Sequence, residues 1–229
     1  MTLELKPQGR IEVEIPYGVL EYTAIFKKPV LEGQFIPAKI IGVVLEALNP
    51  WGFKLDGVEL KTRSEKLSDQ AIVFRRTNPA TPGLSLTLGF GKVLVSAENV
   101  DWSEAQQLIE AIAAAMATII DETKAEIESQ HVGLGMHIQL KTRQRNEVTA
   151  PLLSPLAYRL LDGDVKFPGI ILQREKSSVI IDASAAYANA LFVRMFREHR
   201  AEAPLQELAD TLLRDERQLF EVLGLEGTL

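Results

Sequence analysis

A strict alternation of residue types at 131–140, HVGLGMHIQL, constrains the fold of this chain more than any other feature. The aliphatic residues fall on every second position: Val132, Leu134, Met136, Ile138 and Leu140. Successive side chains of a β-strand point to opposite faces, so this period of two predicts an extended strand with one face in a core. We therefore expect a sheet that buries the aliphatic side and turns both histidines away from it.

Other segments of the chain share the character of strands. Residues 11–15 and 19–26 predict a strand pair with a turn at Pro16-Tyr17-Gly18, and residues 167–174 and 177–184 predict a hairpin that turns at Glu175-Lys176. Residues 51–98 predict an antiparallel meander, in which Asp56-Gly57 is a strong signal for a tight hairpin.

Helical spacing of apolar residues predicts four helices, at 37–48, 103–128, 184–200 and 204–223. Residues 152–164 are ambiguous and fit a short helix. The middle of the long helix, AIAAAMA at 111–117, carries no charge on any side. We expect that part to be covered on more than one face, either by a second layer of the chain or by a partner subunit.

These segments together predict an α+β fold. Its core is a mostly antiparallel β-meander sheet, with the long helix at 103–128 and two C-terminal helices packed on it. We expect one domain over 1–229, and a subdivision near 148–150 is the alternative.

Composition excludes several kinds of site and partner. The chain has 229 residues, no cysteine and a formal net charge of −6. Without cysteine there are no disulfides, catalytic thiolates, iron–sulfur clusters or cysteine-ligated zinc ions. The acidic balance argues against nucleic acid as a partner, because binding to phosphates needs a basic face. No secretory signal and no run of about 18 apolar residues is present, so we expect a soluble cytoplasmic protein without a membrane partner.

The strand at 131–140 also supplies the first set of candidate ligand or interface residues. Gly133, Gly135, His137, Gln139 and Lys141 share the face opposite the aliphatic residues. Two glycines on one face leave a smooth strip that another backbone or a ligand can approach closely. We favour a helix packed across this strip over a ligand groove.

We expect no metal ion and no other cofactor. His131 and His137 are six residues apart, which is roughly 20 Å along a strand. Ligand distances near ~2 Å therefore prevent one ion from binding both. The third histidine, His199, lies far away in the sequence.

Three arginines form a second candidate site. Arg194, Arg197 and Arg200 repeat every three residues near the expected C-terminus of the helix at 184–200. Cations there complement the helix dipole, which is the interpretation we favour. The alternative is an anion site or a surface for an acidic partner.

Short stretches that approach known catalytic or binding motifs do not complete them. GLSLT at 83–87 lacks the second glycine of a nucleophile elbow, and GFG at 89–91 lacks the lysine of a phosphate loop. DGD at 162–164 does not continue as a calcium loop. No catalytic residue is therefore assigned.

The sequence leaves three functions open. The first is a non-enzymatic interaction or assembly protein that forms a homo-oligomer or binds another protein. The second is a small apolar-ligand-binding protein with a pocket between the sheet and the long helix. The third is an enzyme whose groups meet only in space, and the lack of a catalytic pattern places it last.

Overall fold

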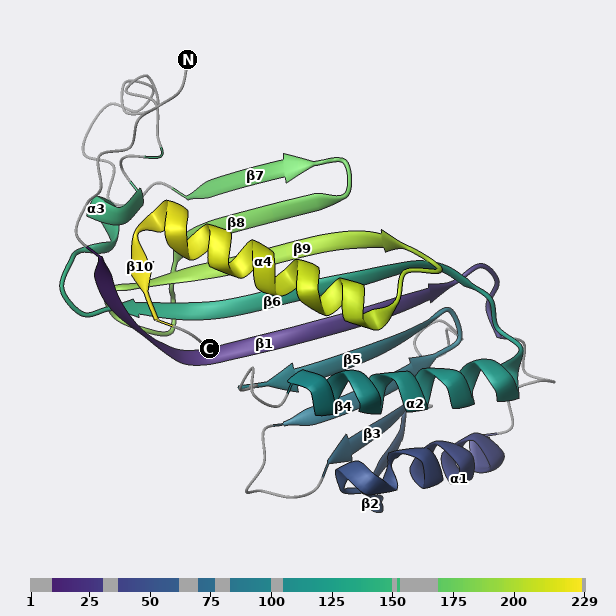
Figure 1. The fold of residues 1–229 in the computed structure, drawn as a ribbon. Coiled ribbons are helices and arrows are strands. Elements are labelled where there is room, and N and C mark those ends of the chain that lie inside the picture. The colour runs from purple at the N-terminus through teal and green to yellow at the C-terminus, as the bar shows by residue number, and fades with distance from the viewer. Residues whose placement is uncertain are drawn as a thin grey trace. The chain divides into compact units, whose positions relative to one another are not determined.

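The computed structural model of the protein describes residues 10–30, 37–61, 70–76, 83–99, 105–149, 152 and 169–227. These residues form an α+β fold with ten strands and four α-helices, including a C-terminal helix (Figure 1). The predicted fold class is confirmed. No helix in the described ranges is long and apolar enough to cross a membrane.

The strands form one hydrogen-bonded sheet, which is mostly antiparallel. Their order is β2-β3-β4-β5-β1-β6-β9-β8-β7, and the short β10 pairs in parallel with the start of β1. The bounds are β1 Ile11–Phe26, β2 Phe53–Lys61, β3 Ala71–Arg76, β4 Leu84–Gly89, β5 Lys92–Glu98, β6 Ile127–Leu140, β7 Ile170–Arg174, β8 Ser177–Ala183, β9 Ala190–Arg200 and β10 Leu225–Glu226.

The chain divides into two compact units. The meander unit comprises residues 19–133 and 197–210, and the hairpin unit comprises residues 1–18, 134–196 and 211–229. Strands β1, β6 and β9 contribute residues to both units. The expectation of one domain, with 148–150 as the alternative boundary, stays a prediction.

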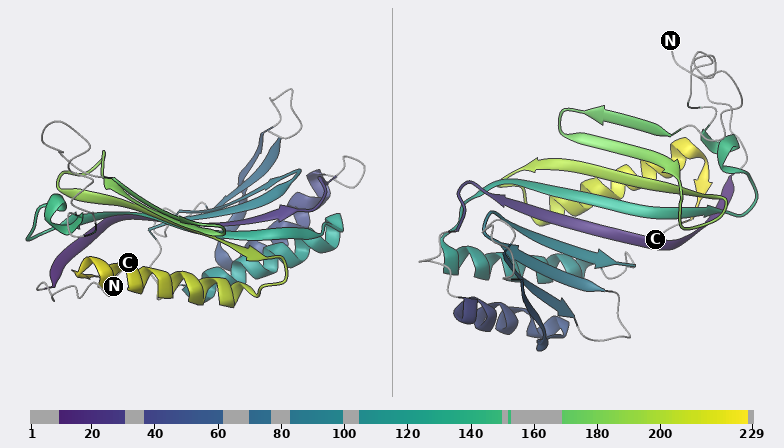
Figure 2. Two further views of the ribbon diagram at one scale, coloured as in Figure 1. Left: turned by 90° about the horizontal axis from the view of Figure 1, so that it is seen from above. Right: turned by 180° about the vertical axis from the view of Figure 1, so that it is seen from behind.

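The meander unit takes its name from strands β2 to β5, which pair antiparallel in chain order as predicted. Helices α1 (Pro37–Leu48) and α2 (Ala105–Thr123) lie side by side on this sheet (Figures 1 and 2). Apolar side chains of both helices and of the strands form a single buried cluster, which includes Val44, Phe74, Leu88, Val93 and Ile119.

Helix α1 packs against α2, whose middle carries no charge. The two helices are in contact, and Ala111 and Ala115 of α2 are buried while Ala113 and Ala117 are exposed. Alanine at these positions lets neighbouring helices approach closely because no long side chain separates them. Helix α2 thus meets a second helix of the same chain, while Ala113 and Ala117 stay exposed.

Helix α2 ends at Thr123, earlier than the predicted limit of 128. Lys124 has a φ of 54°, and its amide donates to the carbonyl of Ile120, as in a helix that ends on a left-handed residue. The Thr123 hydroxyl also accepts a hydrogen bond from the Ala125 amide. Ile127, which fits the helical pattern, is instead the first residue of β6.

A buried glutamine joins β6 to the segment that follows β9 within the meander unit. The Gln130 side-chain amide lies within hydrogen-bond distance of three carbonyls, those of Arg200, Ala201 and Ala203. Its oxygen accepts a hydrogen bond of 2.8 Å from the Tyr22 hydroxyl. Burial of Tyr22 raises the pKa of this hydroxyl above its ordinary value.

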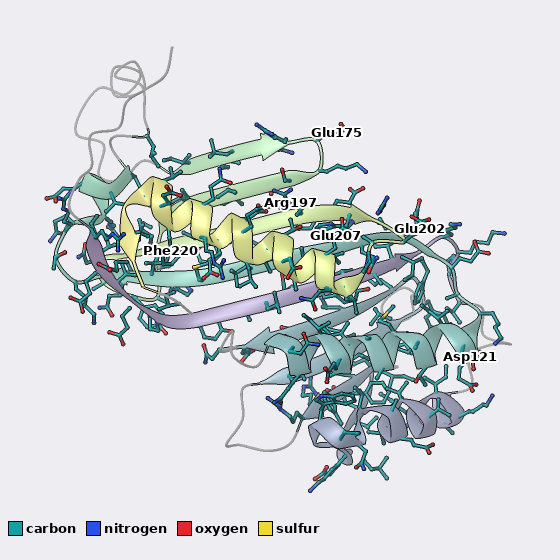
Figure 3. The ribbon with its side chains drawn as sticks, in the orientation of Figure 1. Asp121, Glu175, Arg197, Glu202, Glu207 and Phe220 are labelled. Carbon is teal, nitrogen blue, oxygen red and sulfur yellow. The ribbon has the colours of Figure 1, made fainter. Side chains whose placement is uncertain are left out.

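The hairpin unit holds β7, β8, most of β9 and the second half of β6. Strands β7 and β8 form the predicted hairpin, and Glu175 lies at its tip (Figure 3). Helix α4 (Leu205–Leu223) lies on one face of the sheet (Figure 2). Its apolar stripe is buried as predicted for 204–223, with Leu212, Phe220 and Leu223 in this unit.

The predicted helix at 184–200 is wrong, because residues 190–200 form strand β9. Leu191, Val193 and Met195 are buried and Arg194 is exposed, which is the alternation of a strand. Strand β9 lies between β6 and β8, so it is hydrogen-bonded on both sides. A strand in that position can be apolar at consecutive residues, and such a run also fits the spacing of a helix.

Two predicted turns lie inside continuous strands. Strand β1 runs through Pro16-Tyr17-Gly18, and β2 runs through Asp56-Gly57. The pairing of β2 with β3 changes register between Phe53 and Val58, which is how a bulge accommodates extra residues without reversing the chain. Both turn signals therefore lie within strands and do not mark hairpins.

Candidate functional site

Strand β6 arranges the first set of candidate residues as the alternation predicted. Val132, Leu134, Met136, Ile138 and Leu140 are all at most 5% exposed. On the opposite face Gly135, His137 and Gln139 are half-buried, while Lys141, one residue past the strand, is exposed and Gly133 is buried. The two histidines thus face away from the aliphatic core, as expected.

The His137 imidazole is held by a serine from the loop that precedes β9. Its Nδ1 lies 2.8 Å from the Ser184 hydroxyl. That hydroxyl also accepts hydrogen bonds from the amides of Ala186 (3.2 Å) and Tyr187 (3.0 Å). A serine hydroxyl has two lone pairs and one proton, so the amides leave its proton for Nδ1. Nδ1 is therefore the acceptor, and Nε2 carries the proton of the neutral ring.

Three aromatic rings surround this imidazole. The ring centroids of Tyr187 and Phe192 each lie 5.2 Å from that of His137, and the Tyr17 centroid lies 6.1 Å away. All three contacts are tilted, which is a favourable geometry for aromatic pairs. Tyr17, His137 and Phe192 come from β1, β6 and β9, which are adjacent strands. We call these three residues and Tyr187 the imidazole cluster.

Asn189 fixes the loop that carries Ser184 and Tyr187. It has a φ of 50°, a left-handed value that asparagine tolerates better than most residues. Its side-chain amide donates to the carbonyls of Leu140 and Arg143, and its side-chain oxygen accepts from the Arg145 amide. The loop before β9 is thereby joined to the end of β6 and to α3 (Arg145–Thr149).

The imidazole cluster does not have the arrangement of a catalytic pair. A Ser–His pair needs a hydroxyl oxygen with a free lone pair and a group that orients the base. Both lone pairs of the Ser184 oxygen accept amide hydrogens, and within the described part of the chain no carboxylate is hydrogen-bonded to Nε2 of His137. The cluster presents an oriented donor beside aromatic surface, which is better suited to binding than to nucleophilic attack.

Lys141 forms an exposed ion pair with Glu14, which lies on β1 in the same unit. Exposed pairs of this kind contribute little to stability. Elsewhere on β6, the His131 Nε2 lies 3.2 Å from the Ser129 hydroxyl. In the ranges that the structure covers, no group of three or more His, Asp or Glu side chains is arranged to hold a metal ion.

The arginine set does not form the predicted helical cluster. Arg194, Arg197 and Arg200 lie on strand β9, so there is no helix C-terminus for them to complement. Alternation along the strand puts Arg194 and Arg200 on one face and Arg197 on the other. The three arginines, which the sequence spacing placed on one surface, therefore do not share one face of the strand.

An exposed apolar edge strand is a feature that sequence reasoning missed. Strand β7 ends the order of the described strands, and Ile171 and Leu172 on it are 70% and 59% exposed. Their partners on β8, Ile180 and Val179, are only half-buried. Apolar surface therefore lies on both faces of this hairpin. The sequence predicted the hairpin, but it carried no signal that β7 would be at an edge.

Comparisons with known proteins add little to this geometry. No protein-family model and no curated protein matches the chain. A rolling circle replication initiator protein from Geobacillus stearothermophilus is similar over 89% of this chain and 80% of its own, with 10% identity and a TM-score of 0.28. A likeness at that TM-score supports no argument about fold or function.

Proposed function

We propose that this protein is a non-enzymatic interaction protein that self-associates through the edge strand β7. The observation that carries the proposal is the exposed pair Ile171 and Leu172 on β7, the last of the described strands in the sheet order. Edge strands offer unpaired backbone groups to other strands, and proteins normally protect them with charges, prolines or bulges. The central residues of β7, Ile171-Leu172-Gln173, include none of these.

The opposite edge of the strand order shows such protection. Strand β2 also exposes two leucines, Leu55 at 70% and Leu60 at 50%. Each is flanked by charged residues, in the sequences KLD and ELK. The register shift between Phe53 and Val58 also makes this edge irregular. The contrast with β2 supports β7 as the edge that another strand covers.

A second copy of the chain is a suitable occupant for this edge. In an antiparallel pairing with two-fold symmetry, Leu172 lies opposite its own counterpart, and Ile171 lies opposite Gln173. No like charges then face each other across the central three residues. Leu172 and Val179 share one face of the hairpin, so the two copies form a continuous apolar stripe of four side chains there.

The interface would be small, because β7 has only five residues. Contacts of this size form weak complexes, so we expect a dissociation constant on the order of 10 µM. The charge-free middle of α2 gives self-association less support, since helix α1 of the same chain contacts α2. The β7 edge is the feature that now supports the proposal.

Sedimentation equilibrium of the full chain tests this proposal. We expect the wild type to dimerise at high micromolar concentration. Leu172→Lys places two ammonium groups opposite each other at the two-fold axis, so we expect dimerisation to weaken about tenfold or more. Leu55→Lys on β2 is the matched control, because it makes the same change at a similarly exposed edge position. A strictly monomeric wild type, or a Leu172→Lys variant that dimerises as well as the wild type, would overturn the proposal.

A further inference from the structure

We propose that the imidazole cluster binds a flat aromatic small molecule that carries a hydrogen-bond acceptor, such as an aromatic carboxylate. This site is distinct from the β7 edge and does not depend on self-association. It also differs from the pocket expected between the sheet and the long helix, because the cluster lies on the other face of β6 from the aliphatic core. It uses Tyr17, His137, Tyr187 and Phe192.

The first support is the orientation of His137. Ser184 donates to Nδ1 and is itself fixed by the amides of Ala186 and Tyr187, so the imidazole plane is held on one side. The proton on Nε2 then points away from that anchor. Among the described residues no group is hydrogen-bonded to Nε2 of His137. Nε2 is also not one of the polar side-chain atoms that are fully buried without a partner. It is therefore a positioned donor that remains available to a ligand.

The second support is the aromatic surface around that donor. Tyr17, Tyr187 and Phe192 are each half-buried. Aromatic rings that lie across adjacent strands stack flat ligands, which gain dispersion and quadrupole interactions with little loss of side-chain entropy. The ligand class follows from the two features together, since a flat ring meets the aromatic residues and its acceptor meets Nε2–H.

The third support is the glycine beside His137 on β6. Gly135 precedes it by two residues and therefore lies on the same face. Gly135 has no side chain and therefore adds no bulk of its own beside the imidazole. Gln139, two residues further on that face, adds a polar side chain at the other side of the imidazole.

Titration with 2-naphthoate, followed by the NMR signals of the His137 ring nitrogens, tests the inference. We expect saturable shifts with a dissociation constant of about 1 mM, which is typical of a ligand of this size in a shallow site. Decahydro-2-naphthoate keeps the carboxylate but lacks the flat ring, and we expect it to bind at least about tenfold more weakly.

Variants separate the donor from the rings. His137→Phe retains an aromatic side chain but loses Nε2–H, so we expect binding to weaken about tenfold, the change for one lost hydrogen bond. His131→Phe makes the same substitution on the same strand outside the cluster and should bind like the wild type. Tyr187→Leu, in the loop before β9, should also weaken binding, and it tests the cluster if His137→Phe does not fold.

Three results would overturn the inference. They are the absence of saturable shifts at His137 with 2-naphthoate, equal binding of the saturated analogue, and unchanged affinity in both His137→Phe and Tyr187→Leu. None of these measurements depends on whether the chain is a monomer or a dimer. Ligand binding and the proposed self-association can therefore be refuted independently of each other.

Discussion

Replacement of Gln130 by leucine removes a buried hydrogen-bond network without a large change in volume. Gln130 is 3% exposed, accepts from the Tyr22 hydroxyl and donates toward the carbonyls of Arg200, Ala201 and Ala203. The Arg200 carbonyl keeps a second donor, the amide of Ala203, and Ala201 is only half-buried, so water can reach it. The groups left buried without a partner are therefore the Tyr22 hydroxyl and the Ala203 carbonyl.

These two groups set the size of the effect. A buried polar group without a partner costs about 1–3 kcal/mol, so Gln130→Leu should lower the free energy of unfolding by roughly 3 kcal/mol. Tyr22→Phe leaves only the glutamine oxygen without its donor, and it should cost about 1–2 kcal/mol. Urea unfolding followed by circular dichroism measures both values.

The double variant supplies the control. Tyr22→Phe with Gln130→Leu removes both partners of one hydrogen bond, so its cost should fall short of the sum of the single variants by about 1 kcal/mol or more. If Gln130→Leu changed stability by less than about 0.5 kcal/mol, or if the two substitutions were additive, the assignment of a buried network would be refuted.

The remaining predictions concern the pH dependence of stability and two other residues, Asn189 and Met136. Burial raises the pKa of Tyr22, so above pH ~10 the folded chain keeps a proton that the unfolded chain releases. The free energy of unfolding should therefore fall as the pH rises above that value. Tyr22→Phe should remove the contribution of this group to the pH dependence, as measured by urea unfolding at several pH values. Asn189→Gly keeps the left-handed φ but loses the side-chain hydrogen bonds, so thermal unfolding should show a loss of about 1–2 kcal/mol. Asn189→Ala should cost roughly 1 kcal/mol more, because alanine also disfavours that φ. Met136→Ala, at a fully buried position of β6, should cost about 2–5 kcal/mol in urea unfolding.

Regular periodicity made much of the fold predictable. Helix α1 begins at Pro37 and ends at Leu48, the predicted residues, because proline at the start and apolar spacing agree there. The buried face of β6 was also predicted, since a single face meets the core and leaves a clear period of two. The long helix was predicted, but its end was placed too far along, because Ile127 continues the helical spacing by coincidence.

The errors arose where the tertiary environment decides between two local structures. In β9 the run from Ala190 to Met195 is mostly apolar because β6 and β8 both pair with it, and such a run satisfies helical and strand spacing alike. At Asp56-Gly57 the local turn signal is strong, yet pairing with β3 continues past it through a register shift. In both segments the secondary structure is decided by pairing with another strand, and a short stretch of sequence does not include that partner strand.

Only part of the candidate site could be predicted from the sequence, for the same reason. His137 and its neighbours on β6 were selected from alternation alone. Ser184, Tyr187 and Phe192, which complete the surroundings of the imidazole, come from the segment that was predicted to be a helix. In a helix these residues would not lie across a strand from His137, so the wrong assignment of 184–200 concealed the cluster.

Disulfide trapping at Leu172 tests the pairing of β7 with its own copy most directly. The chain has no cysteine, so Leu172→Cys supplies a single thiol. In the two-fold pairing this residue faces its counterpart with a Cα separation of about 4.5–5.5 Å, which lies within the range that a disulfide spans. Under mild oxidation we expect Leu172→Cys to form a covalent dimer and Leu55→Cys, similarly exposed on β2, to stay monomeric. A Leu172→Cys variant that stays monomeric, or one that cross-links no faster than Leu55→Cys, would contradict self-association through this edge.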